Sequence, residues 1–218
     1  VGHRIVHGGQ HFVETTEISK EILTEIEQLS HLASLHNPRS IQVFHKFKNH
    51  FREKVPSYAV FDTSFHRTIP EYASMYALPR SFCEKYSIKR YGFHGIAHQG
   101  MLNAYLKSTS KSVGRRVITV QLGSGCSVCA IYEGNSIDTS MGFTPLEGLI
   151  MSTRSGDIDP ALPGYIARAE GLSFEEAERL LNSECGLKGL TGGVADMEEI
   201  LSAKRKGDAN SLQALEAL

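Results

Sequence analysis

The chain has 218 residues, of which 41% are hydrophobic and 22% are charged, and its formal net charge is −1. This composition is typical of a water-soluble globular chain that can bury a sizeable core and form up to two domains. A charge this close to zero gives no electrostatic reason to expect nucleic acid or an anionic membrane as a partner. No apolar run has the length of a membrane span and no signal peptide is evident, so we expect a cytoplasmic protein.

Strands and helices alternate along the first half of the chain. Residues 1–7 predict a strand that leads into Gly8 and Gly9, and residues 58–63 predict a buried strand that carries Asp62 at its end. Helical periodicity predicts four helices, at residues 19–33, 38–51, 79–86 and 96–108.

The second half begins with a predicted β-hairpin, in which residues 117–122 and 126–132 flank the turn Gly123-Ser124-Gly125. A long loop is expected over residues 136–160. Three helices follow, at residues 161–170, 173–183 and 196–206, and the second opens with a Ser-x-x-Glu capping box at Ser173. Mixed strands and helices predict an α/β fold. The chain starts without Met and stops inside a helical pattern, so we expect a piece of a longer protein.

The four cysteines favour buried structural roles over chemistry. Cys126 and Cys129 form a C-x-x-C, but the predicted strand places residues three apart on opposite faces. A redox pair of this kind needs a helix start, and a zinc site needs a second pair of ligands that Cys83 and Cys185 do not supply.

The predicted loop over residues 136–160 holds three aspartates, one arginine (Arg154) and several turn formers, which indicates a ligand site. Glycine lets backbone approach a ligand, and arginine offers a planar, permanently charged fork to phosphate or carboxylate. The turn at residues 123–125 could present backbone N–H groups to an anion, or be an ordinary hairpin turn. Asp62 could hold Mg²⁺ or orient a nucleophile, or only cap a turn.

Among the ten histidines, His7, His36 and His94 lie beside Gly or Asn-Pro in loop contexts. A histidine N–H in such a loop can stabilise the charge on a phosphoryl group during transfer. Metal binding is the competing interpretation, but the histidines lack the local spacing of zinc ligands.

Seven segments together resemble the acetate kinases and their propionate and butyrate kinase relatives, in the actin-like ATPase superfamily. They are G-H-R-I-V-H-G-G (2–9), H-N-P (36–38), F-D-T-S-F-H (61–66), Y-G-F-H-G (91–95), L-G-S-G-x-S (122–127), D-T-S-M-G-F-T-P-L-E-G (138–148) and T-R-S-G-D-I-D-P (153–160). The resemblance implies an actin-like, ribonuclease H-like fold in two incomplete domains with a cleft between them. Residues 1–62 would be part of an N-terminal domain, and residues 63–218 part of a central domain for nucleotide binding and dimerisation.

The implied activity is reversible transfer of the ATP γ-phosphate to acetate, giving acetyl phosphate and ADP, by a cytoplasmic homodimer with Mg²⁺. The resemblance assigns catalytic roles to Arg4, His36, Asp62, His94 and Arg154, with Asp62 also at the metal. It assigns the acyl pocket to Arg4, Val6, Leu35, Phe93 and Pro145, and nucleotide binding to Gly123, Ser124, Gly125 and Asp196. Placement and positive charge dominate catalysis of this kind.

The chain departs from the family pattern on the nucleotide side. Gln121 and Ser124 replace a histidine and an asparagine, and Glu198 stands where the family tends to have arginine. The N-terminal phosphate loop and the C-terminal segment with a metal-binding glutamate lie outside the chain, so we expect the isolated 218 residues to be inactive. A divergent non-catalytic paralogue, a kinase for a related short-chain acid or another phosphoryl donor, and a structural domain stay open as alternatives.

Overall fold

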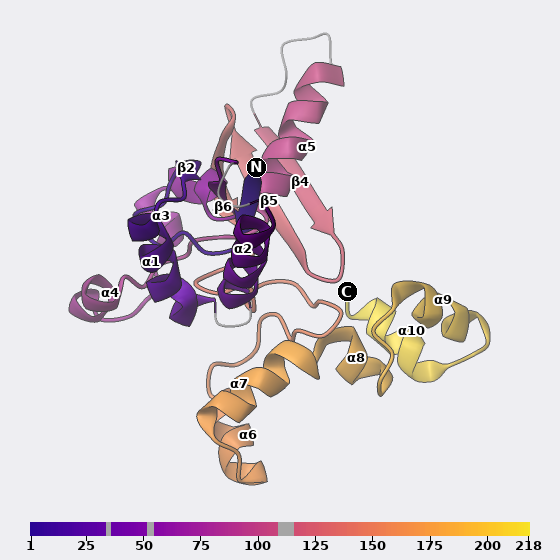
Figure 1. The fold of residues 1–218 in the computed structure, drawn as a ribbon. Coiled ribbons are helices and arrows are strands. Elements are labelled where there is room, and N and C mark those ends of the chain that lie inside the picture. The colour runs from indigo at the N-terminus through magenta and orange to yellow at the C-terminus, as the bar shows by residue number, and fades with distance from the viewer. Residues whose placement is uncertain (34–35, 52–54, 109–115) are drawn as a thin grey trace. The chain divides into compact units, whose positions relative to one another are not determined.

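A computed structural model describes residues 1–33, 36–51, 55–108 and 116–218 (Figure 1). Contacts between residues divide the chain into two compact units. The first comprises residues 1–121 and 128–145, and the second comprises residues 122–127 and 146–218. The domain boundary predicted at residue 62 falls inside the first unit, so it stays a prediction about the whole protein.

The first sheet of the first unit has the strand order β1-β3-β2. Strand β1 (Gly2–Ile5) runs parallel to β3 (Tyr58–Phe61), and the short β2 (Thr16–Glu17) runs antiparallel to β3. Parallel neighbours need a crossover connection, which here is helical. Its elements are α1 (Lys20–Gln28), the 3₁₀ helix η1 (Leu29–Leu32) and α2 (Asn37–Phe51).

This crossover confirms the two helices predicted between the strands, with one change. The helical pattern over 19–33 ends as an α-helix at Gln28 and continues as a 3₁₀ turn. The sheet and the crossover share one apolar core, formed by Ile5, Phe12, Ile18, Ile26, Ile41, Phe44, Ala59 and Phe61. Burial of these side chains fixes the ends of β1 and β3, and the polar residues of the candidate site lie at these ends.

The segment after β3 contains four helical elements. The predicted helices appear as α4 (Arg80–Tyr86) and α5 (Gly95–Ser108). Two elements were not expected, the 3₁₀ helix η2 (Ser64–Thr68) and α3 (Glu71–Ser74). Each is about one turn long, too short to give a periodic apolar pattern in the sequence.

The second sheet has the order β4-β5-β6, from β4 (Arg116–Leu122), β5 (Cys126–Tyr132) and β6 (Asn135–Thr139). Strand β6 shows that the loop predicted over 136–160 was wrong at its start. A tight turn at Glu133 (φ 48°) and Gly134 (φ 86°) returns the chain antiparallel to β5, with Tyr132 opposite Asn135. A left-handed pair is the usual geometry of a two-residue hairpin turn.

The second unit is helical. Its elements are α6 (Leu162–Glu170), α7 (Phe174–Ser183), α8 (Gly186–Thr191), α9 (Met197–Arg205) and α10 (Ala209–Glu216). The predicted capping box is confirmed, because the Ser173 hydroxyl accepts from the Glu176 N–H and the Glu176 carboxylate accepts from the Ser173 N–H. Helix α8 was not expected, and α10 lies in the helical pattern at the end of the chain. A small core of Leu187, Ile200 and Ala214 joins α8, α9 and α10.

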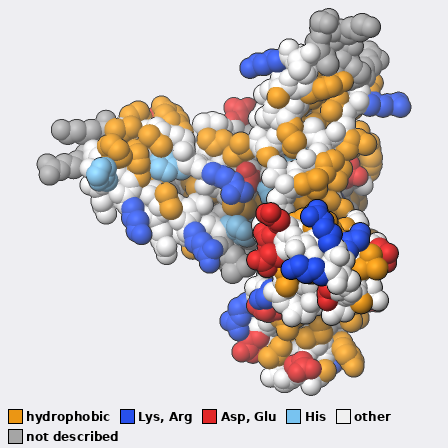
Figure 2. Space-filling view, turned by 90° about the vertical axis from the view of Figure 1, so that its right-hand side faces the viewer, with side chains coloured by type: hydrophobic (Ala, Val, Ile, Leu, Met, Phe, Trp, Pro, Cys, Tyr) orange, Lys and Arg blue, Asp and Glu red, His pale blue; other side chains and the backbone are white. Residues whose placement is uncertain are grey.

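The surface carries charges of both signs (Figure 2), and the cysteines are free thiols. Charged side chains of both signs mix over the face shown in Figure 2. Cys126 and Cys129 are buried thiols, which confirms their structural interpretation, and Cys83 and Cys185 are partly buried thiols. Among the described residues, no helix is both long and apolar enough to cross a membrane.

Candidate active site

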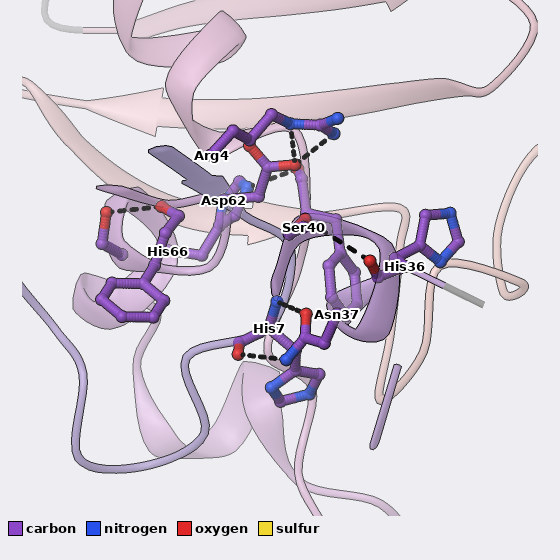
Figure 3. Close-up of polar contacts among 10 residues, drawn as sticks. Arg4, His7, His36, Asn37, Ser40, Asp62 and His66 are labelled. Carbon is purple, nitrogen blue, oxygen red and sulfur yellow. Dashed lines mark hydrogen bonds and ion pairs between the residues drawn. The ribbon is translucent and has the colours of Figure 1, made fainter. Parts of the chain in front are cut away.

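Arg4 and Asp62 form an ion pair at the ends of the two parallel strands. Arg4 lies in β1, and Asp62 follows the last residue of β3. The Arg4 side chain donates from Nε (2.9 Å) and from a terminal nitrogen to the same oxygen, Oδ2 of Asp62 (Figure 3). The Asp62 side chain is 2% exposed and the Arg4 side chain is 58% exposed. A buried carboxylate therefore orients a guanidinium whose other face meets solvent.

The backbone of Asp62 is fixed on both sides. Its N–H donates to the Ile5 carbonyl (3.0 Å), and its carbonyl accepts from the Gly95 N–H (2.8 Å). Burial raises the pKa of the Asp62 carboxyl, and the hydrogen bond from Arg4, its charge and that of His36 oppose this rise. Desolvation therefore outweighs the stabilisation of the charged carboxylate by Arg4.

His7 and Asn37 join the end of β1 to the start of α2. The His7 N–H donates to the Asn37 side-chain oxygen, and the Asn37 amide donates to the His7 carbonyl, both at 3.1 Å (Figure 3). The His7 ring accepts from the Gly9 N–H through Nδ1 (3.0 Å). Burial lowers the pKa of His7 to about 4. The sequence offered His7 as a donor to a phosphoryl group, but its side chain is fully buried.

The loop at residues 91–95 carries two of the predicted site residues. Phe93 is 1% exposed, and the centroid of its ring lies 5.4 Å from that of the His7 ring in an edge-to-face arrangement. His94 has φ +57°, in the left-handed region. For a residue other than glycine this conformation costs about 1–2 kcal/mol. The loop leads directly into α5, and the Gly95 N–H ties it to Asp62.

The first unit brings together several of the residues predicted from the sequence. Arg4 and Asp62 are in direct contact, and His94 is adjacent to the residue that binds the Asp62 backbone. His36 lies close enough to influence the Asp62 pKa, and Val6 is buried. Leu35 lies outside the described residues. Pro145 ends the first unit and is partly buried.

The remaining predicted residues belong to the second unit. Arg154 is partly buried. Burial raises the pKa of the Cys126 thiol, and the charge of Arg154 opposes this rise. The turn at 123–125 is present, and the Ser124 carbonyl accepts from the Ser152 N–H (3.0 Å). Asp196 caps α9, with its Oδ1 accepting from the N–H groups of Glu198 (2.9 Å) and Glu199 (3.0 Å). Nucleotide binding by these residues stays a prediction.

The sequence interpretation missed two polar residues that the structure makes central. Asn37 is fully buried and bridges two elements, although it was noticed only as part of H-N-P. His66 is 3% exposed and binds the Phe93 carbonyl through Nε2 at 2.9 Å. Both residues lie in polar stretches of the sequence, S-L-H-N-P-R-S and F-D-T-S-F-H-R-T, so no contrast with apolar neighbours marked them.

Among the described residues, no group of three His, Cys, Asp or Glu side chains is placed to hold a metal ion. Asp62 therefore stands as a single carboxylate with Arg4 on one of its oxygens. Mg²⁺ that arrives with a nucleotide is commonly held by one or two carboxylates together with phosphate oxygens and water. One carboxylate fits that arrangement and does not fit a preformed all-protein site.

The acetokinase family model matches residues 1–218. The chain belongs to the acetokinase family. It is 46% identical over 218 residues to an acetate kinase of Coprothermobacter proteolyticus, covering 99% of this chain and 54% of that protein. An acetate kinase of Thermotoga maritima is 47% identical over 210 residues, with 95% and 52% covered. The chain thus spans about half the length of these curated relatives.

Solved structures agree with the family assignment. A propionate kinase from Francisella tularensis superposes with a TM-score of 0.93 at 42% identity, covering 99% of this chain and 56% of that one. An acetate kinase from Porphyromonas gingivalis gives a TM-score of 0.88 at 37% identity, with 100% and 54% covered. These acetokinase structures confirm the predicted α/β fold of the actin-like ATPase type.

Proposed function

We propose that the protein that carries this chain is an acetate kinase, which transfers the ATP γ-phosphate reversibly to acetate. The observation that carries this proposal is the Arg4–Asp62 pair, in a chain of the acetokinase family. A guanidinium held by a buried carboxylate has a fixed direction, so it can bind an anion with little reorganisation. The product, acetyl phosphate, forms when a carboxylate oxygen attacks the γ-phosphorus and ADP leaves.

Each residue of the site has a role in this proposal. Arg4 binds the acetate carboxylate and the phosphoryl group in transfer, and Asp62 orients Arg4. His94 donates to the equatorial phosphoryl oxygens, and His36 assists nearby. Arg154 supplies the second positive charge. Phosphoryl transfer needs little covalent help, so positioned positive charge and donors account for most of the rate.

The remaining contacts of the proposal concern the acyl group, the nucleotide and the metal. The methyl group of acetate would lie against Val6, Leu35, Phe93 and Pro145. Gly123, Ser124, Gly125 and Asp196 would contact ATP. Asp62 would hold Mg²⁺ through water, and the ion would neutralise charge on the phosphates.

A hydroxamate assay of acyl phosphate tests the activity. The complete protein, with ATP, Mg²⁺ and acetate, is expected to form acetyl phosphate, and EDTA is expected to abolish the reaction. An apolar pocket separates acids that differ by one methylene by only about 1–3 kcal/mol, so propionate and butyrate belong in the same assay. GTP and pyrophosphate test the donor. If no combination of acid and donor gives an acyl phosphate, the non-catalytic alternative remains.

Two further properties follow from the proposed function. ATP is a cytoplasmic metabolite, so we place the protein in the cytoplasm. We also propose a homodimer, as the resemblance implies. Sedimentation of the complete protein tests the dimer, and a single monomeric species at micromolar concentration would contradict it.

A further inference from the structure

His94 has an unusual backbone for its position. Three residues other than glycine have positive φ among those described, namely Ser87, His94 and Glu133. Ser87 ends α4 and Glu133 forms a hairpin turn, and both are places where left-handed backbone is common. His94 instead precedes the first residue of α5, where an extended backbone is usual. The local sequence does not account for this conformation, so the surroundings must impose it.

Glycines on both sides of His94 allow the close packing that holds the loop. A Cβ on Gly92 would lie 2.5 Å from the Thr139 side chain and 2.8 Å from the His66 ring. A Cβ on Gly95 would lie 2.2 Å from the Asp62 carbonyl oxygen. The N–H groups of Tyr91 and Gly92 both donate to the Gly142 carbonyl, at 3.1 and 3.2 Å. Backbone bonds therefore fix the loop at its start and at its end.

Between these anchors, the His66 side chain holds the carbonyl of Phe93, the residue immediately before His94. His66, from η2, contacts the Phe93 carbonyl through Nε2 at 2.9 Å and the Ser136 hydroxyl through Nδ1 at 2.8 Å. Ser136 lies in β6 and is fully buried. His66 thus connects the second sheet to the loop that carries His94.

The chemistry of the partners fixes the proton positions. A carbonyl only accepts, so Nε2 of His66 carries the hydrogen that Phe93 receives. Burial lowers the pKa of His66 to about 4, so the ring is neutral at pH 7 and Nδ1 accepts from the Ser136 hydroxyl. The Ser136 oxygen then accepts from the Cys129 thiol, 3.3 Å away. Burial raises the pKa of this thiol to about 11, which keeps it protonated.

We propose that His66 is a positioning residue for phosphoryl transfer, which holds the Phe93 carbonyl so that His94 keeps its left-handed backbone and its side chain meets the phosphoryl group. This inference rests on the proposed function. In this proposal, the hydrogen bonds that run from Cys129 through Ser136 and His66 to the Phe93 carbonyl set the direction of the His94 imidazole. An ordinary buried histidine would affect stability alone, whereas a positioning residue changes turnover more than substrate affinity.

Three variants of the complete protein test the role. His66→Phe fills the volume and removes both hydrogen bonds, and we expect kcat to fall by about 10²-fold while KM for ATP stays within about twofold. His66→Gln keeps an N–H at the position of Nε2, and we expect it to recover most of the lost turnover. Thr68→Val is the control, because it removes a hydrogen bond from Thr68 to the Ser136 carbonyl (2.9 Å) that does not lead to the loop, and its kcat should stay unchanged.

Crystal structures of the same variants give a readout apart from activity. In His66→Phe we expect His94 to leave the left-handed region, and in His66→Gln to keep it. If His66→Phe does not fold, Ser136→Ala replaces it. This substitution removes one of the two hydrogen bonds of the His66 ring, and we expect kcat to fall by about fivefold. Unchanged kcat in the folded variants, or His94 still left-handed in His66→Phe, would overturn the inference. An inactive wild-type protein would instead refute the proposed function, and the crystal structures would still decide the role of His66.

Discussion

Arg4 and Asp62 meet through two nitrogens of the guanidinium and one oxygen of the carboxylate. This arrangement leaves part of the guanidinium directed at solvent while its orientation is fixed from the buried side. The two residues are 58 positions apart in the sequence. They meet because the parallel register of β1 and β3 brings the ends of both strands to the same edge of the sheet.

Arg4→Lys tests the need for this fork. Lysine keeps the charge, but a single ammonium cannot bind Asp62 and a substrate anion in the same planar geometry. We expect kcat/KM for acetate to fall by about 10²-fold, measured by the hydroxamate assay. Arg67→Lys is the matched control, because Arg67 pairs with Glu14 at 2.9 Å on the surface. If the two substitutions lowered kcat/KM equally, the Arg4–Asp62 pair would have no more effect on activity than a surface ion pair.

Gly95→Ala tests the close contact between the loop and Asp62. The added Cβ would lie 2.2 Å from the Asp62 carbonyl oxygen, so the loop and the strand end must separate. We expect both the unfolding free energy and kcat to fall. Gly100→Ala, in the same helix, meets nothing within 4 Å and should raise the unfolding free energy by about 0.5–1 kcal/mol. Urea unfolding compares the two, and a loss of stability limited to Gly100→Ala would contradict this packing.

Arg154→Ala tests the second positive charge of the proposed site. If Arg154 acts on the phosphoryl group in transfer, kcat of the complete protein should fall by about 10²-fold, with a much smaller rise in KM for acetate. Arg179→Ala is the control, since Arg179 contacts Glu176 at 3.9 Å on the surface of α7. An unchanged kcat in Arg154→Ala would remove Arg154 from the proposed mechanism.

Buried histidines predict how stability depends on pH. Burial lowers the pKa values of His7, His66 and His98 to about 4, from 6.5, and it also lowers the pKa of His3. The folded state therefore binds fewer protons than the unfolded state between these values, so the unfolding free energy is highest above pH 6.5 and falls as the pH decreases to about 4. The slope is at most about 1.4 kcal/mol per pH unit for each histidine. The raised pKa of Asp62 acts in the opposite direction.

Urea unfolding at pH 7.5, 6 and 5 measures this slope. His66→Gln removes one of these titrating groups, so its unfolding free energy should change less with pH than that of the wild type. Equal slopes in wild type and His66→Gln would show that His66 titrates normally in the folded protein.

The sequence pattern predicted most of the long elements and few of the short ones. Helices α2, α5 and α7 have several turns of apolar periodicity, and their predicted limits differ from the observed ones by only about one residue. Strand β6 was missed because its core-facing positions, Ser136 and Thr139, are polar. Their burial depends on partners from distant elements, such as His66, which local periodicity does not register.

Prediction of the site depended on a different kind of signal. A polar residue at the end of an apolar strand pointed to Asp62, and the structure pairs it with Arg4 as two opposite charges at one sheet edge require. His66 and Asn37 could not be assigned roles in this way. Each is buried and acts through backbone groups, Phe93 for one and His7 for the other, and backbone partners leave no mark in the sequence.

The most direct test of the account is the turnover of His94→Asn in the complete protein. Asparagine is among the residues that best tolerate left-handed backbone, so this substitution removes the imidazole and leaves the loop in place. We predict that kcat for acetyl phosphate formation falls by about 10²-fold while KM for ATP hardly changes, and that His11→Asn, at an exposed position, has wild-type kcat. A kcat for His94→Asn within about threefold of wild type, equivalent to less than about 1 kcal/mol in the barrier, would contradict the claim that this loop presents His94 to the phosphoryl group.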